Sequence, residues 1–432
     1  MKNKKYLFVT GVIILLIFTI LFYILANKEG LKDLTVEEKI EDFEYMYEIL
    51  KDNYSHFYEI KKIYGYDWLS HKEEFEKEIR KTKDNMEFYH CMQRILITEL
   101  HDDHTLILDP SYYNTYLDVM KVYEDAYEAF KPFEKMFKKA GKKYEGWYQL
   151  FLEEYPDIYI NKNVDLASRN KPKDNIKAHV IEEGKIAYLK IQSFFIDYGN
   201  NEKGYEKEKN KITNFLNDIK DYPYLIIDIT GNGGGSSKYW IESLVSPLSN
   251  KDMKDINYEA INIIRGGDYT MKYFEYHFPE IKQNSIEKLD FYNSIPKEVK
   301  DNFKYYIKTG MQEELEERNS IGFNGKIFLI VDENVYSAAD EFARFCNQSN
   351  FATLAGTKTT GSGGNNTMFM ILPNSGLMLR FEAEMLLNKD GTSQYETGTI
   401  PDIEIQKEEF GDYGIKAMKE IIDIIRSEEQ NK

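Results

Sequence analysis

Short apolar runs alternate with helical periodicities between residues 185 and 355, and this alternation constrains the fold more than any other feature of the chain. The pattern predicts strands at 185–191, 224–229, 326–331 and 352–355, with helices at 207–220, at 238–245 and from 337 onward. Strands that alternate with helices in this way form parallel pairs joined by crossover helices. We therefore expect an α/β fold.

The segments on either side of this pattern have a different character. Helical periodicities from residue 35 to 160, with a capping box at Thr35 and Glu38, predict a small N-terminal helical bundle. A polar linker is expected at 161–175. The predicted domains are residues 1–27, 35–160, 176–410 with an insertion at 250–320, and 411–432. Within the third, residues 367–387 are expected to form two antiparallel strands; the last is a C-terminal helix.

Residues 6–26 form an uncharged apolar run that follows Lys2, Lys4 and Lys5. About 20 such residues suffice to cross a bilayer as a helix. Basic residues before the span favour a cytoplasmic N-terminus. We expect a single-pass cell-membrane protein whose catalytic domain is extracytoplasmic. A cleaved signal peptide is the alternative, although residues 24–26 lack small residues at both cleavage positions.

Composition excludes some partners. The formal net charge of −17 argues against a nucleic-acid partner, because phosphate binding needs a concentrated basic surface. The two cysteines, Cys91 and Cys346, lie in apolar helical patterns, where a free thiol is expected, with a disulfide as the alternative. There is no Cys/His array with zinc-ligand spacing.

Ser337 opens a helix soon after the apolar run at 327–331, in the stretch Asn-Val-Tyr-Ser-Ala-Ala-Asp-Glu of residues 334–341. A serine at such a turn lies beside backbone N–H groups that can hold an oxyanion. Ser337 is therefore a candidate nucleophile. The same residues, through Asp340, fit a helix-capping pattern, so a structural N-cap is the alternative.

Three further segments carry candidate residues. The glycine loop at 228–236 lacks the lysine of a P-loop, and its amides fit either a small anion or a tight turn. The run His101-Asp-Asp-His104 fits a general base, a metal ligand or a solvated loop. Glu396 precedes a turn and is either an exposed acid or an orienting carboxylate.

Taken in order, these segments resemble the C-terminal processing peptidases and their tricorn-core relatives. The shared motifs are D-x-x-G-N-G-G-G at the glycine loop, S-A-A-D-E at 337–341, G-x-x-T-x-G at 356–361, E-x-G-x-x-P-D at 396–402 and L-x-D-x-H-T at 100–105. The resemblance implies a ClpP/crotonase-like α/β core and a serine peptidase that cleaves peptides or proteins without a cofactor or metal. It assigns Ser337 as nucleophile, His104 as base, Glu396 as their acidic partner, and Gly233, Gly234 and Ala338 as the oxyanion hole.

Two departures refine the resemblance. The bacterial processing peptidases place a catalytic lysine after the G-x-x-T-x-G turn, where this chain has Ser362, and Lys358 falls elsewhere in the turn. The tricorn-like Ser/His arrangement therefore fits better. Asp103 replaces the serine that precedes the tricorn base, which leaves Asp103 and His101 as accessory candidates. No PDZ domain is expected between 105 and 185. A non-catalytic ligand- or peptide-binding protein on the same fold is the alternative function.

Overall fold

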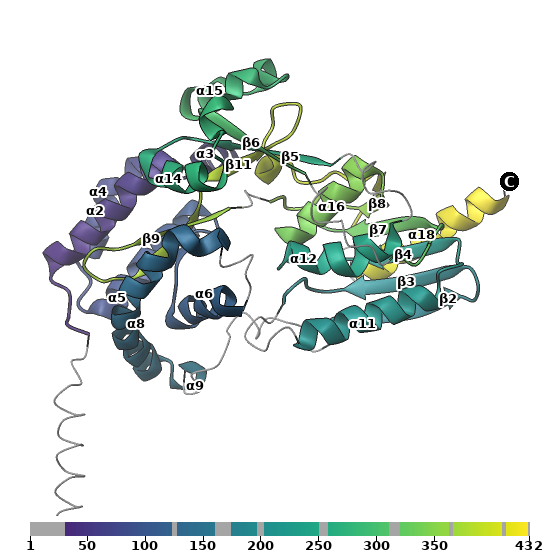
Figure 1. Ribbon diagram of the computed structural model, residues 1–432, viewed down its shortest axis with the longest axis horizontal. Coiled ribbons are helices and arrows are strands. Elements are labelled where there is room, and N and C mark those ends of the chain that lie inside the picture. Colours follow the sequence, from purple (N-terminus) through teal and green to yellow (C-terminus); the bar gives the residue numbers. More distant parts are fainter. Residues whose placement is uncertain are drawn as a thin grey trace, which may run out of the picture.

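The computed structural model describes residues 31–122, 128–159, 174–196, 203–249, 258–310, 320–362, 366–407 and 412–430. Figure 1 shows a helical part beside an α/β part, with a third group of elements above both. The helical part consists of α2 (Val36–Asn53), α3 (Phe57–Tyr64), η1 (Trp68–His71), α4 (Lys72–Ile79), α5 (Asn85–Gln93), η2 (Arg94–Thr98), α6 (Pro110–Val122), η3 (Lys131–Phe133), α8 (Glu134–Glu154) and α9 (Pro156–Tyr159). The capping box predicted at Thr35 and Glu38 starts α2.

The α/β part is built on a six-stranded sheet. Its strand order is β12 (Ile403–Glu404), β8 (Thr353–Gly356), β7 (Lys326–Val331), β4 (Tyr224–Asp228), β3 (Ile186–Ile191) and β2 (Ile176–Glu182). All neighbouring pairs are parallel except β2 with β3. The predicted parallel strands are thus confirmed, and their apolar runs are long because both faces of the sheet are covered.

Helices cover the two faces separately. One face carries α11 (Lys203–Asp218), α12 (Ser237–Trp240), η5 (Ile241–Val245), α13 (Ser246–Leu248) and α16 (Ala338–Ser349). The other face carries α18 (Tyr413–Gln430), the predicted C-terminal helix, whose Ile421 and Ile425 pack on Ile226 and Phe328. Helix α16, which follows Ser337, is held in place because its apolar side chains are buried against the first face of the sheet.

Two smaller sheets complete the fold. One has the order β11 (Glu384–Leu387), β5 (Glu259–Ile264) and β6 (Tyr305–Gly310), and the other β1 (Leu106–Ile107), β10 (Met378–Glu382) and β9 (Thr367–Ile371). Short helices accompany them: α14 (Asp268–His277), η7 (Ile281–Gln283), η8 (Ile286–Lys288), η9 (Tyr292–Ser294), α15 (Lys297–Asn302) and α17 (Gln394–Thr397).

The segment 367–387 differs from the prediction of two antiparallel strands. Strands β9 and β10 are antiparallel neighbours as expected. Beyond Ala383, however, the chain leaves this sheet and pairs with β5 as β11. Besides β9, strand β10 pairs with β1, whereas β11 pairs with β5, and both β1 and β5 lie far away in the sequence.

Among the described residues, no helix is both long and apolar enough to cross a membrane. The predicted fold contained such a helix, and the predicted single-pass, extracytoplasmic location depended on it. Both are corrected: the fold is α/β, and no helix of its described part could span a membrane. Residues 6–26 lie outside the described residues, as does most of the predicted linker.

Cys91 and Cys346 are both free thiols, which excludes the disulfide.

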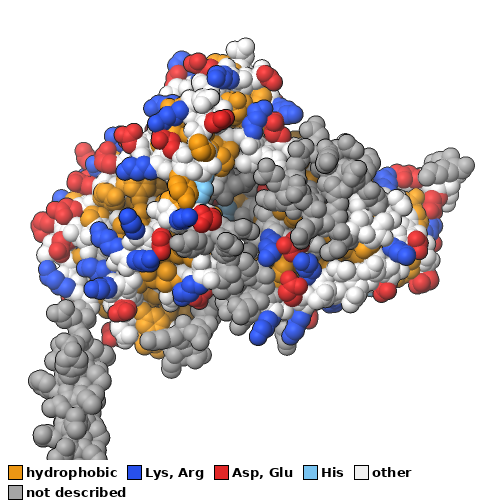
Figure 2. Space-filling view, in the orientation of Figure 1, with side chains coloured by type: hydrophobic (Ala, Val, Ile, Leu, Met, Phe, Trp, Pro, Cys, Tyr) orange, Lys and Arg blue, Asp and Glu red, His pale blue; other side chains and the backbone are white. Residues whose placement is uncertain are grey.

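On the described surface in Figure 2, acidic and basic side chains are interspersed.

Candidate active site

Ser337 occupies the N-cap position of α16 in an unusual backbone conformation. Its φ of 56° and ψ of −130° are costly for a residue with a side chain, by about 1–3 kcal/mol. The side chain makes no capping hydrogen bond. Asp340, the other half of the expected capping pattern, instead accepts hydrogen bonds from Thr359 (2.5 Å) and Thr399 (2.8 Å). The hydroxyl of Ser337 is therefore not used to cap the helix.

The glycine loop packs directly against Ser337. A Cβ atom at Gly234 would lie 2.8 Å from the Ser337 Cβ and 3.0 Å from the Ala338 amide nitrogen, so only glycine fits there. The Gly234 N–H donates to Asn232 Oδ1 at 2.9 Å. Within the described part of the chain, no hydrogen bond uses the N–H of Gly233 or Ala338. These two amides are therefore the candidate oxyanion donors, and the absence of a side chain at Gly234 permits the close approach of the loop to Ser337.

His104 contacts the residue that precedes the nucleophile candidate. Its ring stacks on Tyr336, the residue before Ser337, with centroids 5.0 Å apart. Its backbone is fixed on both sides, because its N–H donates to Asp102 Oδ1 (2.8 Å) and its carbonyl accepts from Arg380 Nε (2.8 Å). Asp102 is itself buried and accepts a hydrogen bond from the Tyr54 hydroxyl at 2.8 Å. The histidine is thus held rigidly against the start of α16.

The carboxylate that contacts His104 belongs to Glu382, which the sequence did not single out. His104 Nδ1 lies 2.5 Å from Glu382 Oε1. Strand β1 pairs antiparallel with β10 through Leu106 and Arg380. His104 lies two residues before Leu106 and Glu382 two residues after Arg380, so the same register brings these two side chains together. Burial lowers the pKa of His104, but the charge of Glu382 outweighs it and raises this pKa above its ordinary value. Such contacts fix the tautomer and orientation of a catalytic base.

A second histidine contacts the other oxygen of Glu382. His56 Nε2 lies 2.8 Å from Glu382 Oε2, and His56 Nδ1 lies 3.3 Å from Glu59 Oε1. Burial alone would raise the pKa of the Glu382 carboxyl, but His104 and His56 hold it well below its usual range. The residues form one chain of contacts, in the order Glu59, His56, Glu382, His104.

The other predicted residues lie around this chain. Glu396 pairs with Lys62 (2.6 Å), so in the described structure its carboxylate has a different partner from the one predicted. His101 is exposed, has a φ of 49° and stacks on Tyr64 with centroids 4.0 Å apart. Asp103 is exposed as well. No group of metal-ligating side chains occurs in the part of the chain that the structure describes.

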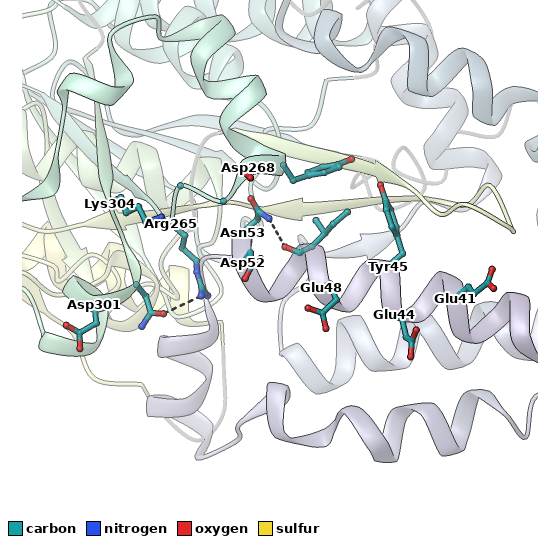
Figure 3. A pocket seen from close by; sticks show the side chains of 15 residues that line it. Glu41, Glu44, Tyr45, Glu48, Asp52, Asn53, Arg265, Asp268, Asp301 and Lys304 are labelled. Carbon is teal, nitrogen blue, oxygen red and sulfur yellow. Dashed lines mark hydrogen bonds between the residues drawn. The ribbon is translucent and has the colours of Figure 1, made fainter.

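A separate open pocket of about 870 Å³ lies at the surface of α2 (Figure 3). Its charged lining comes from Glu41, Glu44, Glu48 and Asp52 of α2 and from Arg265, Asp268, Asp301 and Lys304. None of the predicted site residues lines this pocket.

Residues 185–405 match Peptidase family S41, more than half of the 432-residue chain. The chain belongs to this family. The resemblance seen in the motifs is thereby confirmed. S41 enzymes are serine peptidases, which supports a serine peptidase function for this member. The matched residues include Ser337, the glycine loop and Glu382, whereas His104 and His56 precede them.

Two solved structures are similar to this S41 member. Mature CPAF is 13% identical with a TM-score of 0.50, and the alignment covers 90% of this chain and 96% of CPAF. A protein from Parabacteroides merdae is 16% identical with a TM-score of 0.49, and the alignment covers 89% of this chain and 96% of that one. At these identities the CPAF similarity shows the fold alone. No curated protein sequence matches the chain.

Proposed function

We propose that this S41 member cleaves peptides or proteins through an acyl-enzyme formed on Ser337, with His104 as the base. The observation that carries the proposal is the contact of His104 with both Tyr336 and Glu382. Because Nδ1 of His104 faces a carboxylate, Nδ1 carries the proton and Nε2 is the nitrogen left to act as base.

In the first step, the Ser337 hydroxyl attacks the carbonyl carbon of the substrate while His104 accepts the hydroxyl proton. The N–H groups of Gly233 and Ala338 stabilise the negative oxygen of the tetrahedral intermediate. His104 then gives the proton to the leaving amine, and water releases the acyl group from Ser337 by the same steps. We assign the orientation of His104 to Glu382, with Glu396 as the alternative carboxylate.

A fluorophosphonate probe tests the nucleophile. The wild-type protein is expected to be labelled, and Ser337→Ala to lose the label completely, because the probe reacts only with an activated hydroxyl. Ser362→Ala is the matched control: Ser362 stands where the dyad peptidases have their lysine, and its loss should leave labelling intact. Equal labelling of wild type and Ser337→Ala would refute the assignment. A folded protein that takes no label and cleaves no member of a peptide library would instead be a binding protein.

Gly234→Ala tests the packing at the nucleophile. The added methyl group would meet the backbone of residues 336–338, which cannot yield as a flexible side chain could. We expect kcat to fall by about 10²–10³-fold, as for the loss of oxyanion stabilisation, because Ser337 and the Ala338 amide are displaced. Steady-state kinetics with a peptide substrate measures the loss. Gly204→Ala is the control, since Gly204 lies exposed in α11 with no atom near its added methyl group. Unchanged kcat in Gly234→Ala would contradict the proposed geometry.

A further inference from the structure

We infer that His56 is a positioning residue of the proposed peptidase site. As an imidazolium, it fixes the Glu382 carboxylate in place and reduces the effect of the negative charge of Glu382 on the pKa of His104. This inference rests on the proposed function and extends it to a residue that lies far outside the S41 match. It is carried by the hydrogen-bond geometry around the His56 ring, by the backbone contacts beside it and by the charges of the cluster.

The geometry determines the charge of His56. Its two ring nitrogens lie 3.3 Å from Glu59 Oε1 and 2.8 Å from Glu382 Oε2. Ionised carboxylates only accept hydrogen bonds, so both contacts are hydrogen bonds only if both nitrogens carry a proton. Burial opposes this charge, but the two carboxylates outweigh it and raise the pKa of His56 well above its ordinary value. The ring is therefore a cation at neutral pH.

The position of His56 is fixed by its neighbours. The ring is 1% exposed, stacks on Tyr395 with centroids 5.2 Å apart and meets Tyr54 edge-on at 5.6 Å. Just before it, Ser55 donates hydrogen bonds from both its N–H and its hydroxyl to the Glu382 carbonyl, each at 3.2 Å. The corner between α2 and α3 thus holds both the backbone and the side chain of Glu382.

The charges around the two histidines set the direction of the effect. His56 is faced by Glu59, Glu382 and the phenols of Tyr54 and Tyr395. His104 is faced by Glu382, Tyr336, Asp102 and Arg380. Without the His56 cation, Glu382 would attract a proton on His104 more strongly. His104 would then stay protonated, and unable to act as a base, up to a higher pH.

The pH dependence of kcat/KM tests this inference. His104 must be neutral to act as the base, so activity rises with pH through its titration. In His56→Gln, which replaces the cation with a neutral hydrogen-bond donor, the midpoint of this rise should move up by about one pH unit. Glu59→Gln removes the anion that stabilises the cation and should move the midpoint in the same direction, which provides the test if His56→Gln fails to fold. His90→Gln, at an exposed histidine that also faces a glutamate, should leave it unchanged.

A second measurement separates this inference from the proposed function. The seven histidines can be ¹³C-labelled, and the titration of His104 followed by NMR in a Ser337→Ala background, where turnover is not needed. We expect the His104 midpoint to rise when His56→Gln or Glu59→Gln is added. An unchanged or lowered midpoint in both variants would overturn the inference even if the wild type is an active peptidase. If the His104 midpoint rises but the fluorophosphonate does not label the wild-type protein, the charge coupling is upheld and only the proposed function is refuted.

Discussion

His104→Asn is expected to reduce kcat by roughly 10⁵–10⁶-fold, because a serine hydroxyl without its base is a poor nucleophile at neutral pH. The ring of His104 lies against Tyr336 and is held by Glu382. KM should change little, since the substitution removes proton transfer rather than substrate binding. Steady-state kinetics with a peptide substrate, together with a melting curve to verify folding, measures the effect.

His101→Asn is the matched control for this prediction. The substitution is the same and lies three residues away on the same loop, but the His101 ring is exposed and stacks on Tyr64. Asparagine also tolerates the positive φ found at this position. Activity within a few-fold of wild type is expected. A loss as large as that of His104→Asn would show that the accessory role considered for His101 is a catalytic one.

Glu382→Gln should lower kcat by about 10³–10⁴-fold, the size of effect found when the carboxylate behind a catalytic histidine becomes an amide. The amide can donate to Nδ1, which would place the proton of His104 on Nε2 and deprive the site of its base. The pKa of His104 should also fall, because the charge that raises it is removed. The acid limb of the pH profile therefore moves down, opposite to the shift expected for His56→Gln.

Glu396→Gln decides between the two carboxylates. In the structure this side chain pairs with Lys62, a contact that is partly exposed and worth little. We expect kcat to fall less than about 10-fold. If Glu396→Gln proves as damaging as His104→Asn while Glu382→Gln stays active, the assignment implied by the family resemblance holds and ours does not.

The residues of the site were predictable to different extents from the sequence. Ser337, the glycine loop and His104 stand in motifs whose order along the chain carries the family signal. Glu382 and His56 have no such motif. Glu382 faces His104 only because β1 pairs with β10 in one particular register, and a pairing over 278 positions leaves no local pattern. His56 reaches Glu382 through the corner between α2 and α3, which depends on how the helical part docks.

The elements of the fold were also predictable to different extents from the sequence. The parallel strands β3, β4, β7 and β8 were predicted because each is buried on both faces and reads as an apolar run. The passage from β10 to β11 was missed, since Ala383, the residue between the two strands, is neither a glycine nor a proline that would signal a break. Only the different neighbours of the two strands reveal the change of sheet. The membrane-spanning helix was predicted from the uncharged apolar run at residues 6–26, which lie outside the described residues. No described helix is long and apolar enough to cross a membrane.

The chain of contacts from Glu59 to His104 has a consequence for synthesis of the protein. Ser337 leaves the ribosome before Glu382, and His56 and His104 leave long before either. A chain that stops short of strand β10 contains Ser337 and His104 but lacks the Glu382 carboxylate that contacts the His104 ring. Under the proposed mechanism such a chain lacks the carboxylate that orients the base, so we expect full peptidase activity only after one of the last strands has been made.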